Sequence, residues 1–94
     1  MKIYISGAMA SCPETYKDNF RKAEKELSDQ GFIVINPAVL PKGLKHSNYM
    51  PICLSMIDAA DYIYMMKGWE SSKGAKLEKQ YAEYQEKTIL YEGE

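Results

Sequence analysis

The sequence has few cysteines, almost no excess charge and no long apolar run, and each shortage excludes a class of protein. Its two cysteines, Cys12 and Cys53, lie far apart without a companion histidine cluster, so neither a disulfide framework nor a metal site is expected. No apolar stretch is long enough for a signal peptide or a membrane span. We therefore expect a cytoplasmic protein with no membrane partner.

The net charge and the length of the chain limit the kind of partner and the number of domains that we expect. The 12 basic and 13 acidic residues are interleaved and leave a net charge of −1, which provides no electrostatic footprint for a nucleic acid polymer. A chain of 94 residues holds one core, so residues 1–94 are expected to form a single domain. Because a core of this size is marginal, self-association into a homo-oligomer would help to stabilise it.

Short apolar segments alternate with longer segments of helical period, which predicts an α/β fold with about four parallel strands flanked by three helices. The expected strands are residues 2–6, 32–35, 62–66 and 88–91, each almost continuously apolar, as in parallel strands that are covered on both faces.

Each of the three expected helices has a recognisable start or end. The first spans residues 13–30 and is followed by Gly31, which suits a left-handed cap. The second begins near Ser47 or Asn48, directs Met50, Leu54 and Ile57 inward, and ends before residue 61. The third follows residues 72–74 and continues to about residue 87, with Leu77, Tyr81 and Tyr84 on one apolar edge and Ala75, Glu78 and Ala82 on a second stripe.

Ligands of open α/β sheets bind beyond the carboxyl ends of the strands, and four segments are expected to meet there. The segments after the first and second strands contribute Ser6, Gly7, Ala8, Met9 and Asn36; residues 67–74 and 91–92 follow the third and fourth strands. Gly7 permits close approach of a ligand to the backbone, or it serves the turn alone.

The segment before the third helix allows two interpretations for each of its polar or aromatic residues. Ser71, Ser72 and Gly74 could hold a phosphate or a sugar hydroxyl at the helix start, or the serines could be ordinary helix caps. Trp69 could stack on a base or anchor the packing of the loop. His46, alone between Lys45 and Ser47, is expected to be a loop residue.

Glu78 is the candidate catalytic residue. It lies on a helix stripe otherwise made of alanines, so its carboxylate needs water, a partner or a ligand. A carboxylate placed there could act as a nucleophile at an anomeric carbon. The alternative is a solvated glutamate on the helix surface.

Several of these segments together resemble a small phage and bacterial family of uncharacterised proteins related to nucleoside 2-deoxyribosyltransferases. The resemblance covers most of the chain and is carried by residues 4–9, 36–38, 40–44, 61–64 and 68–78. It implies a Rossmann-like, flavodoxin-like sheet, no cofactor, oligomers that complete each other's pockets, and cleavage or exchange of N-glycosidic bonds.

The resemblance also implies roles for individual residues. In that superfamily a glutamate four residues after a glycine is the nucleophile, and Gly74 and Glu78 have this spacing. Six residues before the glutamate, transferases carry an aspartate, whereas related deoxynucleoside 5′-phosphate N-hydrolases carry a phosphate-binding serine. This chain has Ser72, which favours a 5′-phosphorylated ligand.

The sequence departs from the family pattern at three places. Relatives have an aspartate eight residues before the one that opens the third strand, where this chain has Cys53, and a neutral thiol cannot do the work of a carboxylate. The leucine and glycine that follow the nucleophile are replaced by Lys79 and Gln80, and Ala8 stands where proline is frequent.

Three functions therefore remain open. The leading hypothesis is a protein that binds a nucleoside or nucleotide and cleaves or exchanges its N-glycosidic bond through Glu78. The first alternative is a catalytically silent phage-type protein that sequesters a nucleotide signal of host defence, such as an ADP-ribose derivative. The second is an interaction domain, for which eight tyrosines and six methionines would supply an adhesive surface.

Overall fold

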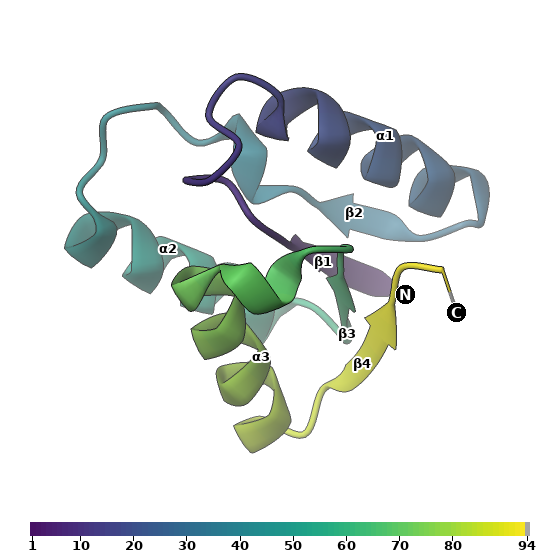
Figure 1. Ribbon diagram of the computed structural model, residues 1–94. Coiled ribbons are helices and arrows are strands. Elements are labelled where there is room, and N and C mark those ends of the chain that lie inside the picture. Colours follow the sequence, from purple (N-terminus) through teal and green to yellow (C-terminus); the bar gives the residue numbers. More distant parts are fainter. Residues whose placement is uncertain (94) are drawn as a thin grey trace.

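A computed structural model describes residues 1–93 and shows strands alternating with helices along the chain (Figure 1). The elements are β1 (Lys2–Ser6), α1 (Tyr16–Asp29), β2 (Ile33–Ile35), the short 3-10 helix η1 (Pro37–Val39), α2 (His46–Ala59), β3 (Tyr62–Met65), the 3-10 helix η2 (Trp69–Ser71), α3 (Lys73–Tyr84) and β4 (Thr88–Tyr91). No helix within residues 1–93 is both long and apolar enough to cross a membrane.

The four strands form one parallel sheet in the order β2-β1-β3-β4. Tyr4 in the central strand β1 is paired with Ile35 of β2 and with Ile63 of β3. This confirms the predicted α/β fold of four parallel strands and three helices. The chain leaves β1 toward β2 on one side and returns to β3 on the other, and crevices for ligands form at such a reversal of strand order.

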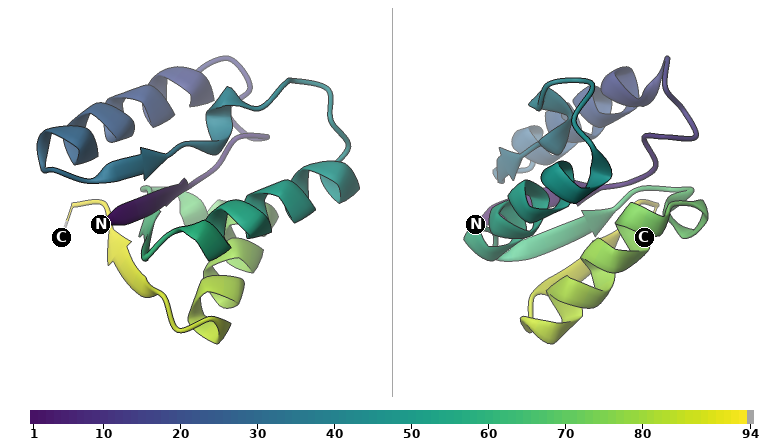
Figure 2. Two further views of the ribbon diagram at one scale, coloured as in Figure 1. Left: turned by 180° about the vertical axis from the view of Figure 1, so that it is seen from behind. Right: turned by 90° about the vertical axis from the view of Figure 1, so that its left-hand side faces the viewer.

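The helices cover the two faces of the sheet unequally (Figures 1 and 2). On one face α1 contributes Phe20, Ala23 and Leu27 to a core with Ile3 and Ile5. On the other, α2 and α3 pack against each other and against the sheet. The core there includes Tyr4, Cys53, Ile57, Ile63, Met65, Ala75 and Ala82. Alternate residues of β1 therefore serve opposite cores.

The ends of the first helix are shifted slightly from those predicted. α1 begins at Tyr16, three residues after the expected start at Pro13, because residues 13–15 form a turn. It ends at Asp29, and Gly31 has the left-handed conformation expected of it, with a φ of +94°. Phe32 precedes β2 and packs edge-on against Tyr62.

Two predicted helix faces were wrong in part. In α2 the fully buried position of the middle turn is Cys53, whereas Leu54 is only partly buried. In α3 the predicted apolar edge is largely solvent-exposed, with Leu77 42% and Tyr84 84% accessible. The stripe of small residues with Glu78 faces the sheet instead, because α3 packs closely against both α2 and the sheet.

Candidate functional site

An open cleft of about 870 Å³ lies at the carboxyl ends of β1 and β3, between α1 and the first turns of α2 and α3. Its walls are formed by the segment after β1, the start of α1, the loop before α2, the first turns of α2, and the segment that leads into α3 together with the first turns of that helix. The residues that line the cleft include Gly7, Met9, Tyr16, Phe20, Lys42, His46, Tyr49, Ser71, Ser72, Lys73, Gly74 and Glu78.

Glu78 lies on the inner side of the cleft and is only 5% exposed. Each of its carboxylate oxygens accepts a hydrogen bond from the central strand. The hydroxyl of Ser6 donates to Oε1 at 2.7 Å, and the phenol of Tyr4 donates to Oε2 at 3.1 Å. Because Tyr4 and Ser6 are two residues apart in β1, both point to the face on which α3 packs.

The environment of Glu78 changes its acidity. Burial raises the pKa of its carboxyl group from 4.5 to about 6, and the hydrogen bonds from Ser6 and Tyr4 oppose part of this rise. A carboxyl group with this pKa is mostly ionised at neutral pH. The site thus holds a carboxylate that is largely shielded from water, fixed in orientation and charged.

The groups that face Glu78 from α2 stay neutral. Burial raises the pKa of the Cys53 thiol to about 11, and burial also raises the pKa of Tyr49 well above its ordinary value. The phenol of Tyr49 contacts the sulfur of Met9 at 2.9 Å and so links α2 to the segment after β1. Glu78 is the one charged side chain that is buried within residues 1–93.

The start of α3 forms another part of the cleft wall. The Ser72 hydroxyl caps this helix by accepting a hydrogen bond from the backbone N–H of Ala75 at 3.1 Å. Ser71 donates to the carbonyl of Gly68 at 2.8 Å. Gly74 lies beside α2: a Cβ atom there would lie 3.4 Å from Cε of Met50 and 3.6 Å from Cε1 of His46, which are ordinary contact distances.

The structure brings together most of the residues singled out from the sequence. Gly7, Met9, Ser71, Ser72, Gly74 and Glu78 all line the cleft. Ser6 lies beneath it with its hydroxyl directed at Glu78. A Cβ atom on Gly7 would lie 3.0 Å from Cβ of Met66, which is a tight contact, so the packing at this position favours a glycine.

Besides Ser6, three of the candidate binding residues lie outside the cleft wall. Asn36 caps η1 by accepting a hydrogen bond from the N–H of Ala38, and it donates to Glu24 at 2.9 Å. Trp69 packs against Tyr91 with ring centroids 6.2 Å apart. Ala8 occupies the bend between Gly7 and Met9 without lining the cleft. For Asn36 and Trp69 the structure therefore shows capping and packing contacts.

His46 was wrongly expected to be a loop residue. It is the first residue of α2 and lines the cleft close to Gly74. Together with Tyr49, three residues later on the same face of the helix, it is a contribution that the sequence analysis missed. Tyr16 and Phe20 of α1 reach the opposite wall of the cleft.

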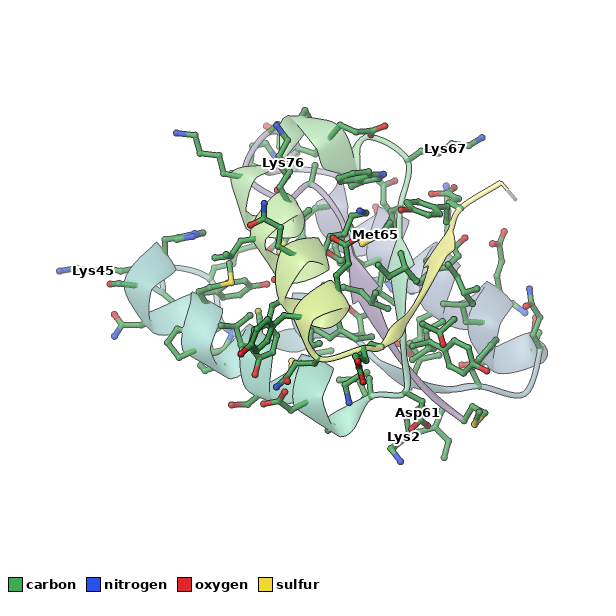
Figure 3. All side chains as sticks on the ribbon, turned by 90° about the horizontal axis from the view of Figure 1, so that it is seen from below. Lys2, Lys45, Asp61, Met65, Lys67 and Lys76 are labelled. Carbon is green, nitrogen blue, oxygen red and sulfur yellow. The ribbon has the colours of Figure 1, made fainter. Side chains whose placement is uncertain are left out.

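Two basic side chains contribute to the lining of the cleft. Lys42 and Lys73 line it, and both are exposed. Lys67 and Lys76 lie at the same end of the sheet, opposite the end where Lys2 is paired with Asp61 (Figure 3). Within residues 1–93 no three histidine, cysteine or acidic side chains come together as metal ligands would.

Comparison with solved structures supports this description of the fold. The chain is similar to the structure titled "2-desoxiribosyltransferase from Leishmania mexicana", with a TM-score of 0.75 and 20% sequence identity. The similarity covers 96% of this chain but 62% of that one, so this chain spans less than two thirds of its length. The likeness extends to the fold of four parallel strands and three helices.

Comparisons at the level of sequence assign the chain to a family without a known activity. No curated protein matches it. A family model described as "Domain of unknown function (DUF4406)" matches residues 1–91, which is nearly the whole chain. The chain therefore belongs to the DUF4406 family.

Proposed function

We propose that the chain binds a nucleoside or nucleotide in the cleft and that the carboxylate of Glu78 attacks the anomeric carbon of its N-glycosidic bond. The observation that carries this proposal is the buried carboxylate of Glu78, held at both oxygens beside an open cleft. The fold is shared with a protein named as a deoxyribosyltransferase, which is consistent with this chemistry.

In the proposed reaction an oxygen of Glu78 forms a bond to C1′ while the bond between C1′ and the base nitrogen breaks. The electron pair of that bond goes to the base, which takes a proton from solvent. Water then hydrolyses the glycosyl ester, or a second base displaces the carboxylate and completes a transfer. A carboxylate shielded from water can also stabilise the oxocarbenium character of the transition state.

A 5′-phosphate is the preferred substituent on the sugar. The backbone N–H groups at the start of α3 favour an anion, and the Ser72 hydroxyl can donate a hydrogen bond while its oxygen accepts from Ala75. Lys73 adds a positive charge on the same wall. The ligand class that fits these groups is a nucleoside 5′-phosphate.

A specific observation favours a second function, which is binding without chemistry. Cys53 is buried and its thiol stays neutral, with a pKa of about 11. It therefore supplies no carboxylate beside Glu78 to position the sugar or assist departure of the base. Under this second function the protein would retain an intact nucleotide, such as an ADP-ribose derivative, and so sequester it.

Incubation with a panel of nucleosides and their 5′-phosphates distinguishes these functions when free base and intact ligand are both quantified. Released base is expected if Glu78 is the nucleophile. Retention of intact ligand without release would support the sequestering function. If neither base release nor binding is observed, both nucleotide functions are rejected in favour of an interaction domain.

A further inference from the structure

Ser6 was expected to contact the ligand, but its surroundings indicate a different role. It is the last residue of β1, is only 1% exposed, and lies below the cleft wall. Its hydroxyl donates to Oε1 of Glu78 at 2.7 Å, which is the shorter of the two hydrogen bonds to that carboxylate. A hydroxyl engaged in this way commits its proton to Glu78 and does not have it free to donate to a ligand.

We infer that Ser6 is a positioning residue, which fixes the carboxylate of Glu78 in its rotamer and keeps it ionised for the proposed reaction. The catalytic part of this inference rests on the proposed function. The effect on the ionisation of Glu78 does not, because it follows from the buried hydrogen bond alone.

Burying the charge of Glu78 has a cost in free energy. A carboxylate taken out of water is disfavoured unless donors replace the lost hydration. Ser6 and Tyr4 supply one O–H donor to each oxygen, and a short charge-assisted bond contributes more than a neutral one. Ser6 therefore offsets part of the penalty that burial places on the charged form.

The other groups that face Glu78 cannot replace this effect by titrating. Tyr4 lies on β1, and Cys53 and Tyr49 lie on α2. Burial raises the pKa of each of these side chains, so all three are protonated and neutral near pH 6. Around that pH the carboxyl group of Glu78 is the group in this cluster that changes charge.

The first test is a titration of the Glu78 carboxyl carbon by ¹³C NMR in the wild type, Ser6→Ala and Ser55→Ala. Removing the Ser6 hydroxyl is expected to raise the midpoint by about one pH unit. Ser55 donates to the backbone of Pro51 on the exposed side of α2, so Ser55→Ala should leave the midpoint unchanged. An unchanged midpoint in Ser6→Ala would overturn the inference.

Ser6→Cys keeps the side-chain size and a weaker donor, and it carries the test if Ser6→Ala does not fold. Its midpoint should lie between those of the wild type and the alanine variant. A midpoint equal to that of the wild type, with Ser6→Ala unfolded, would show that the hydroxyl is needed for packing alone and would contradict the inference.

Steady-state kinetics then separates positioning of Glu78 from contact with the ligand. In Ser6→Ala, kcat should fall by about tenfold or more while KM stays near the wild-type value, because Ser6 touches the carboxylate and not the ligand. A raised KM with unchanged kcat would assign Ser6 to the ligand instead. If the wild type releases no base, the proposed function fails, yet the NMR titration still decides whether Ser6 controls the charge of Glu78.

Discussion

Glu78 is the most important single residue of the candidate site, because it is buried, charged and lines the cleft. The sequence indicated its importance through the alanines on its helix stripe. The donors that hold it were not evident, since Tyr4 and Ser6 are 74 and 72 residues away along the chain. Period-two alternation shows that Tyr4 and Ser6 share a face of β1, but it does not show which helix covers that face.

The raised pKa of Glu78 makes stability depend on pH. Because the folded protein holds this proton more tightly than the unfolded chain, the contribution of Glu78 to the free energy of unfolding is largest below about pH 4.5 and falls as the pH rises toward about 6. Above that it should be lower by about 2 kcal/mol. Glu78→Gln cannot ionise and should show a flatter profile, measured by urea unfolding at a series of pH values.

The carboxyl group of Asp61 also has a shifted pKa, but it does not interfere with the measurement of stability against pH. The hydrogen bond from the backbone N–H of Lys2 and the Lys2 ammonium lower the pKa of Asp61 below 3.8. Its stabilising effect is therefore lost only at lower pH, outside the window in which Glu78 titrates. An equal decline in the wild type and Glu78→Gln between about pH 4.5 and 6 would contradict the assignment to Glu78.

Ser72 links the helix cap to the preference for phosphate, and two variants separate these roles. Ser72→Ala should lose about 1 kcal/mol of stability with the cap to Ala75. Ser72→Asp keeps a capping oxygen but repels an anion. In calorimetry the wild type should bind a nucleoside 5′-phosphate about two- to fivefold more tightly than the nucleoside, and Ser72→Asp should lose this preference. If both variants still preferred the nucleoside 5′-phosphate over the nucleoside as strongly as the wild type does, the phosphate would not bind at the start of α3.

Among the secondary-structure elements, the strands were predicted more accurately than the helix faces. β1 and β4 have the bounds predicted from their apolar residues. The faces of α3 could not be assigned with the same certainty, because Leu77 and Tyr84 have the helical spacing of a core stripe but point to solvent. Sequence periodicity identifies a stripe, whereas the tight packing of α2 on α3 decides which stripe is buried.

The residues that loops contribute to the cleft were the hardest part of the site to predict from the sequence. The path of residues 41–45 has no regular period, so the arrival of Lys42 and His46 at the cleft could not be inferred. Trp69 illustrates a second limit, because a loop tryptophan is equally suited to stacking on a base and to packing. The contact between Trp69 and Tyr91 is visible only in the structure and could not be inferred from the sequence.

The packing between the ends of β1 and β3 can be tested by a substitution at Gly7. In Gly7→Ala the new Cβ atom would lie 3.0 Å from Cβ of Met66, so the variant should lose about 1–3 kcal/mol of stability. Gly74→Ala is the control, since its nearest neighbours, 3.4 Å or more away, are the flexible ends of side chains, and alanine favours a helix by up to about 1 kcal/mol. Equal denaturation midpoints for Gly7→Ala and the wild type would contradict this packing.

For the molecule as a whole we predict a homo-oligomer. Several large apolar side chains are exposed, including Ile33 at 65%, Val39 at 74% and Tyr84 at 84%. In so small a chain this surface is better covered by a second copy than left in water. Multi-angle light scattering at micromolar concentration should give a mass above that of one 10.7 kDa chain, and a strictly monomeric mass would contradict the prediction.

The proposed chemistry at Glu78 can be tested by the rate of base release from a nucleoside 5′-phosphate, measured across pH for the wild type and Glu78→Gln. We expect the wild-type rate to fall about tenfold per pH unit below about pH 6, where the carboxylate becomes protonated, and Glu78→Gln to release no base while still binding the nucleotide. Base release that is unaffected by Glu78→Gln would contradict the claim and place the chemistry in other residues.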